Sequence, residues 1–135
     1  SPAEMAKKMG LGINLGNTLE APLEGNWAPN ATEKDFDEFK AKGFTNVRIP
    51  VRWDQHTGLS APYTIDPAFL ARVETVVGWS LARGFVTVVN THHDNWLDSV
   101  QNFTAMLPRF KAIWTQIAAR FQSKGEELLF EVYNE

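Results

Sequence analysis

Short apolar runs alternate with amphipathic helix patterns along the chain, and this alternation limits the choice of fold more than any other feature. Successive runs begin 33 to 43 residues apart, with one helix pattern between each pair. This spacing suits β-α-β units, in which a helix crosses over between two parallel strands. The four runs are residues 11–16, 44–51, 85–90 and 128–133. The sequence therefore predicts an α/β fold with four parallel strands.

The helix between the second and third runs has the clearest boundaries. Asp66 is a favourable N-cap, Pro67 suits the first helical position, and Gly84 suits the end of the helix. Amphipathic patterns also predict a short lead-in at 3–9, a helix from Thr32 to Gly43 and, after a polar loop at 92–102, a helix with its apolar face over 110–121.

Length allows two interpretations of this fold. At 135 residues the chain has room for one domain with a packed core. A complete eight-stranded β/α barrel takes ~250 residues, so residues 1–135 form either one small domain or half of a larger barrel. The apolar character of 85–90 and 128–133 is typical of parallel strands covered on both faces.

Composition excludes several classes of partner and site. The net charge of −3 and the pI near 5.6 provide no basic patch for nucleic acid or an anionic membrane. The absence of cysteine excludes disulfides and thiolate metal sites, and no apolar run reaches the ~18 residues of a membrane-spanning helix. Two glycosylation sequons, at Asn30 and Asn102, agree with a secreted protein.

Polar residues collect where each apolar run ends. The C-terminal ends of parallel strands meet at one edge of a sheet, where β/α folds place their active sites. The residues concerned are Asn14, Asn17, Arg48, Asn90, His92, His93, Asn134 and Glu135. We therefore predict an active site at this edge.

Arg48 interrupts an apolar run, so its guanidinium needs an acceptor. One interpretation is a structural ion pair with Glu131 or another carboxylate. The other is that Arg48 holds a catalytic carboxylate and keeps it ionised.

His92 and His93 precede Asp94, which raises the question of a metal site. Adjacent residues at a strand end point in different directions, and no third ligand follows at a recognisable spacing. We therefore expect no metal and no cofactor. Hydrogen bonding to substrate hydroxyls or to a catalytic carboxylate is the preferred interpretation, and one of the two histidines is alternatively a packed core residue.

Four segments together resemble a known family, and they occur in the same order and at natural spacing over the whole chain. The segments are GINLGNTLE (12–20), NVRIPVRW (46–53), NTHHDNW (90–96) and FEVYNE (130–135). They are similar to successive strand motifs of glycoside hydrolase family 5, the retaining endoglucanases (cellulases) with a β/α-barrel fold.

The resemblance implies a role for each matched residue. Glu135 would be the general acid/base, Asn134 would bond the sugar 2-hydroxyl, Arg48 would buttress the nucleophile, and His92 would line the cleaved subsite. Residues placed near the substrate groove are His93, Asn17, Glu20, Trp27 and Trp96. The implied substrate is a β-1,4-glucan polysaccharide or oligosaccharide.

The family barrel has eight strands, with its nucleophilic glutamate on the seventh, whereas four strands are predicted here. Retaining hydrolysis needs two carboxyl groups ~5–5.5 Å apart, and no second carboxylate has a motif to support it. We therefore expect half of a (β/α)8 barrel, completed by a C-terminal half or by self-association as a homodimer. The alternative function is a catalytically incomplete half barrel that binds glucan or self-assembles.

Overall fold

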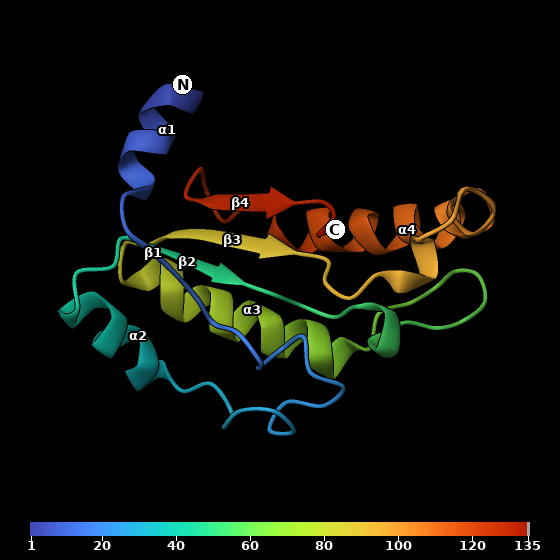
Figure 1. The fold of residues 1–135 in the computed structure, drawn as a ribbon, viewed down its shortest axis with the longest axis horizontal. Helices are drawn as coiled ribbons and strands as arrows, with labels where there is room; N and C mark the ends of the chain where they lie inside the picture. Colours follow the sequence, from blue (N-terminus) through green and yellow to red (C-terminus); the bar gives the residue numbers. More distant parts are fainter. Residues whose placement is uncertain (135) are drawn as a thin grey trace.

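The computed structural model describes residues 1–134, which form one parallel sheet flanked by helices (Figure 1). The strand order is β1-β2-β3-β4, and every neighbouring pair is parallel. The strands are β1 (Gly12–Asn14), β2 (Asn46–Ile49), β3 (Val86–Asn90) and β4 (Leu128–Glu131). The helices are α1 (Pro2–Met9), α2 (Glu33–Ala41), α3 (Pro67–Ala82) and α4 (Val100–Phe121), with 3-10 turns η1 (Asp54–His56) and η2 (Asn95–Leu97). The predicted α/β fold with four parallel strands is confirmed.

Local capping chemistry explains where α3 begins and ends. The Asp66 carboxylate accepts hydrogen bonds from the backbone N–H groups of Ala68 (2.7 Å) and Phe69 (3.1 Å), and Pro67 occupies the first turn. Gly84 has φ 78°, a left-handed conformation that favours glycine after a helix. The boundaries predicted for this helix are therefore confirmed.

The start of α4 differs from the prediction. The helix begins at Val100, inside the loop predicted at 92–102, so the loop is shorter than expected. Ser99 caps it, because its hydroxyl accepts a hydrogen bond from the Asn102 N–H at 3.0 Å. The first turns lack an inward apolar stripe: Val100 is 81% exposed and Phe103 is 46% exposed. The sequence pattern therefore became recognisable only where the helix reaches the core.

Alternate strand residues divide the sheet into two faces. Val47, Ile49 and Val89 have no exposed surface and pack in the core with the inner sides of the helices. Thr87 shares this face, since its hydroxyl lies 2.7 Å from that of Ser80 on α3. Arg48 lies on the opposite face, where Val86 and Asn90 are buried but Arg48, Val88 and Glu131 remain partly exposed. Burial on both faces, as predicted for 85–90 and 128–133, is found in β3, where Val86 and Thr87 on opposite faces are both buried, but not in β4, where Phe130 is 40% exposed.

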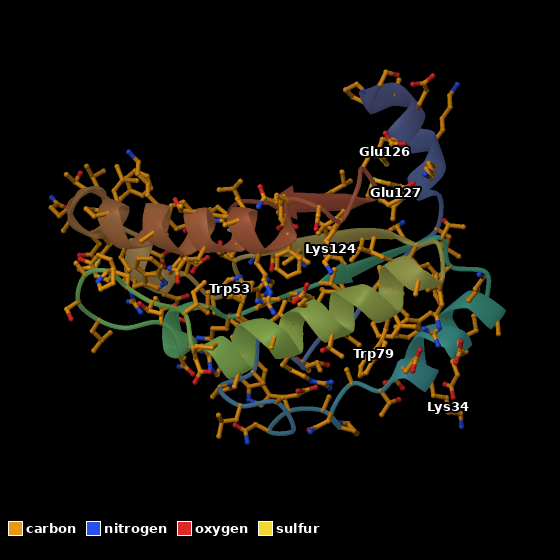
Figure 2. The ribbon with its side chains drawn as sticks, turned by 180° about the vertical axis from the view of Figure 1, so that it is seen from behind. Lys34, Trp53, Trp79, Lys124, Glu126 and Glu127 are labelled. Atoms are coloured by element: carbon orange, nitrogen blue, oxygen red, sulfur yellow. The ribbon has the colours of Figure 1, made fainter. Side chains whose placement is uncertain are left out.

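Trp53 fixes the loop after β2 beneath the strand ends (Figure 2). Its side chain is fully buried, and its indole N–H donates to the Asn90 carbonyl oxygen at 2.9 Å. The Asn90 side chain in turn accepts from the Val51 N–H at 3.2 Å. These bonds tie β2 and β3 together where the predicted site begins.

Among residues 1–134, no helix is both long and apolar enough to cross a bilayer.

Candidate active site

Arg48 and Glu131 form the centre of a polar network at the C-terminal ends of the strands. Arg48 Nε donates to Glu131 Oε2 and Arg48 Nη2 donates to Glu131 Oε1, each at 2.6 Å. Arg48 Nη2 also reaches Asn134 Oδ1 at 3.0 Å, and Nη1 reaches Asn14 Oδ1 at 3.5 Å. One guanidinium thus connects β1, β2 and the segment around β4.

This ion pair sets the charge of Glu131. The hydrogen bonds from Arg48 lower the pKa of Glu131 below its usual range, with a smaller contribution from the Asn90 amide. Glu131 correspondingly raises the pKa of Arg48. The structural ion pair left open by the sequence is therefore present, and Glu131 is an anion at neutral pH.

Asn90 extends the network from Glu131 to His92. Its amide Nδ2 lies 3.4 Å from Glu131 Oε1 and 3.0 Å from His92 Nδ1. Asn90 Oδ1 already accepts from the Val51 N–H, so the nitrogen of the amide faces the histidine. An amide nitrogen only donates, which makes His92 Nδ1 the acceptor and places the proton of the neutral ring on Nε2. Burial lowers the pKa of His92, with further contributions from His93 and Arg48.

Trp27 reaches the same region from the loop between β1 and α2. Its ring lies perpendicular to that of His93 at a centroid distance of 5.7 Å, and the His93 ring lies 4.6 Å from that of His92. Trp27 remains 49% exposed. An exposed indole next to hydrogen-bonding imidazoles is an arrangement that suits stacking on a sugar ring.

Asn17 and Glu20 form a tight turn after β1. The Glu20 carboxylate is buried and accepts from the backbone N–H groups of Asn17 and Thr18, the latter at 2.9 Å. Asn17 adopts a left-handed conformation with φ 61°. The Leu15 N–H, just before this turn, donates to the Arg48 carbonyl oxygen at 2.8 Å, so the turn lies close to the network. The negative charge of Glu20 adds to the raised pKa of Arg48 and offsets part of the lowering of the pKa of His92.

Trp96 has a different set of neighbours. Its indole N–H donates to Asp94 Oδ1 at 3.1 Å, and the Arg109 guanidinium lies over its ring, 5.0 Å from the centroid. Phe110 packs against it with 6.3 Å between ring centroids. The structure thus connects Trp96 to α4, whereas the other predicted residues in the described part of the chain lie around Arg48, His92 and Trp27.

An apolar pocket of about 490 Å³ adjoins the segment that follows β4. It lies between η2, the start of α4 and Tyr133, whose hydroxyl donates to Asp98 Oδ1 at 3.1 Å. Glu135, the predicted acid/base, lies outside the described residues. Within residues 1–134, no three His, Asp or Glu side chains gather closely enough to hold a metal ion.

The sequence does not indicate that Asn90 and Glu131 are central to the site. It places Asn90 among several polar residues at strand ends, and it offers Glu131 as one of several carboxylates that could pair with Arg48. The feature that could have identified them is the presence of a polar residue near the end of an apolar run. Both residues lie in segments that resemble the family motifs, 90–96 and 130–135, but the resemblance gives neither a role.

A family model described as cellulase (glycosyl hydrolase family 5) matches residues 11–135. Endoglucanase H of Acetivibrio thermocellus is 60% identical over 99% of this chain, which spans 15% of that protein. Endoglucanase Cel5A of the hyperthermophilic Thermotoga maritima superimposes with a TM-score of 0.94 at 42% identity, covering 100% of this chain and 43% of Cel5A.

A second solved structure includes a bound oligosaccharide. It is a tri-modular GH5 (subfamily 4) endo-β-1,4-glucanase from Bacillus licheniformis in complex with cellotetraose. Its TM-score is 0.91 at 46% identity, and the match covers 100% of this chain and 27% of that chain. The chain therefore spans less than half the length of each of these three proteins, and its fold matches the N-terminal part of their barrel.

Proposed function

Because the chain belongs to the cellulase family, glycosyl hydrolase family 5, we propose that it supplies part of an active site that hydrolyses β-1,4-glycosidic bonds in glucans. The observation that carries this proposal is the network of Arg48, Glu131, Asn90 and His92 at the C-terminal ends of the strands. Strand ends of this kind are where β/α barrels bind and transform substrates.

The network suggests how the chain would hold a sugar. Arg48 fixes Asn134 through its Oδ1, which orients the amide for hydrogen bonding to the sugar 2-hydroxyl. His92 offers the N–H of Nε2 to another hydroxyl, and burial keeps its ring neutral at pH 7 because it lowers the pKa. The exposed ring of Trp27, supported by His93, provides an apolar platform next to His92.

Glu135 follows Asn134 directly, and we assign it the general acid/base role of a retaining mechanism. Such a mechanism requires a second carboxylate ~5–5.5 Å away as the nucleophile. Glu131 is poorly suited to attack, because both of its oxygens accept hydrogen bonds from Arg48. Both oxygens of Glu20 are occupied by its own turn. We therefore place the nucleophile on another segment of a complete barrel.

The edges of the sheet support completion by a further set of strands. Within residues 1–134, β1 and β4 each pair with one neighbour, and the face that carries Arg48 is only half-buried. A complementing C-terminal half is the completion we propose, since the chain covers 43% or less of these solved relatives. A homodimer is the alternative, and sedimentation distinguishes the two: a well-folded monomer at micromolar concentration contradicts self-association.

Turnover of an aryl cellobioside and of soluble β-glucan tests the proposed reaction. The chain is assayed alone and mixed with the region of Endoglucanase H that follows its matched segment. Glu135→Gln should lower turnover by about 10²- to 10⁴-fold, the usual contribution of a general acid/base. Glu126→Gln is the matched control, because Glu126 lies near α1, away from the strand ends (Figure 2).

Equal rates for the parent chain and for Glu135→Gln would exclude Glu135 as the acid/base. Oligosaccharide binding without turnover in every combination would favour the glucan-binding or self-assembling alternative.

We also propose that the protein is secreted, because polymeric glucan must be cleaved outside the cell before its sugars are taken up.

A further inference from the structure

The part of the loop that carries Trp27 is closed by an acidic residue, Glu24. The loop runs from residue 15 to residue 32 and contains no helix or strand. Glu24 Oε1 accepts a hydrogen bond from the Ala31 N–H at 2.9 Å, although seven positions separate the two residues. This bond closes the segment 24–31 around Trp27.

Arg72 on α3 binds both ends of that closed segment. Its Nε donates to Glu24 Oε2 at 2.9 Å, and its Nη2 donates to Glu24 Oε1 at 2.8 Å and to the Ala31 carbonyl oxygen at 2.7 Å. The side chains of Glu24 and Arg72 are 15% and 30% exposed, so the pair is partly shielded from water. A two-bond fork of this kind fixes direction as well as distance.

The position of Arg72 is itself fixed by the core. Its guanidinium lies over the ring of Trp79, 5.0 Å from the centroid. Trp79 packs on Phe36 of α2, with 6.2 Å between ring centroids, and is visible between α3 and α2 (Figure 2). The loop is therefore anchored to rigid helices through Arg72, whereas the Trp27 ring itself meets the rest of the site at the edge of His93.

We propose that Glu24 and Arg72 are positioning residues that hold Trp27 in place as a sugar-stacking platform. The inference rests on the proposed function, since it assigns the platform a glucan chain as its ligand. A half-exposed indole contributes more to binding when its loop is already ordered, because ordering the loop on binding costs conformational entropy. The fork from Arg72 provides this order in the free protein.

The test uses Arg72→Met and Glu24→Gln, each alone and combined with Trp27→Ala. Arg120→Gln is the matched control, because Arg120 forms a comparable ion pair with Glu74 at 2.6 Å between α4 and α3. Affinity for cellotetraose is measured by calorimetry on the 135-residue chain, and KM is measured where a complementing half restores turnover. Thermal unfolding verifies that each variant is folded.

We expect Arg72→Met to weaken cellotetraose binding by roughly three- to tenfold, the range of one aromatic contact, and to raise KM without lowering kcat. In the Trp27→Ala background it should have no further effect. Amide hydrogen exchange at 24–31 should accelerate in Arg72→Met and Glu24→Gln but not in Arg120→Gln.

Three results would overturn the inference, and they separate its failure from that of the proposed function. Unchanged exchange at 24–31 shows that the pair does not order the loop. If Arg72→Met weakens cellotetraose binding equally with Trp27 present and in the Trp27→Ala background, Arg72 does not act through Trp27. If Trp27→Ala itself leaves cellotetraose affinity unchanged, the platform fails, and the inference fails with it.

Discussion

Arg48 and Glu131 lie 83 positions apart in the sequence, yet they meet through two hydrogen bonds of 2.6 Å. Because β3 separates their strands, the contact crosses the open face of the sheet. It joins the part of the chain that carries Asn14 to the part that carries Asn134. The geometry of the candidate active site therefore depends on this ion pair.

Breaking the pair from one side should cost more than removing both partners. Arg48→Met leaves the Glu131 carboxylate without its main donors, and we expect a loss of about 1–2 kcal/mol in the free energy of unfolding, because the pair is partly exposed. Arg48→Met combined with Glu131→Leu should recover part of that loss. Urea denaturation of the four proteins gives the coupling energy, and additive losses would show that the pair does not act as a unit.

The stability of the chain should fall in acid partly through Glu131. Its pKa is lower in the folded protein than in the unfolded chain, so its contribution is complete above pH ~4.3 and is lost as the pH falls through the folded pKa. Glu131→Gln and Arg48→Met should both show a weaker dependence on pH between 5 and 2 than the parent chain. Parallel curves for all three proteins would contradict the assignment.

The fold was predictable where the signals are local. Asp66, Pro67 and Gly84 determine the ends of α3 through caps that need no distant partner. The start of α4 was missed because Val100 and Phe103 are exposed and give no inward stripe. Apolar periodicity arises where a helix packs on a core, so it does not predict the part of a helix that extends beyond that core.

The site was predictable as a location but not as a set of contacts. Parallel strands bring their polar ends together, and the structure joins Arg48, Asn90, His92 and Asn134 as that rule requires. The choice of Glu131 as the partner of Arg48 depends on strand register, which the sequence alone does not determine. The surroundings of Trp96 likewise depend on Arg109, a residue of the next helix.

Asp94 should show the opposite pH dependence to Glu131. The residue is 2% exposed, and burial raises the pKa of its carboxyl, partly offset by the hydrogen bond from the Trp96 indole. Oδ2 has no hydrogen bond of good geometry, since the Thr91 hydroxyl donates to the Val132 carbonyl oxygen. A raised folded pKa gives stability that is present below pH ~3.9 and lost as the pH rises through the folded value.

Asp94→Asn should therefore gain stability relative to the parent chain as the pH rises from 4 to 8. The amide oxygen still accepts from Trp96, and the buried charge is gone. Trp96→Phe is the comparison variant, because it removes a donor that lowers the pKa of Asp94. With Asp94 retained, it should make the fall in unfolding free energy with rising pH steeper than in the parent chain. Urea denaturation at several pH values measures both effects. A difference in unfolding free energy between Asp94→Asn and the parent chain that does not change with pH would contradict the raised pKa.

His92 should carry its proton on Nε2 and titrate below pH ~6.5, because Asn90 donates to Nδ1 and burial lowers the pKa. Long-range proton–nitrogen NMR reports the tautomer and the midpoint directly. Asn90→Asp replaces the donor with an acceptor, so it should move the proton to Nδ1 and raise the pKa. His56 is the internal control: burial also lowers its pKa, but it stacks on Phe69 at 3.6 Å, away from Asn90, and its titration should not change. A proton on Nδ1 in the parent chain would mean that the Asn90 amide is reversed, and His92 would then offer substrate an acceptor at Nε2 in place of a donor.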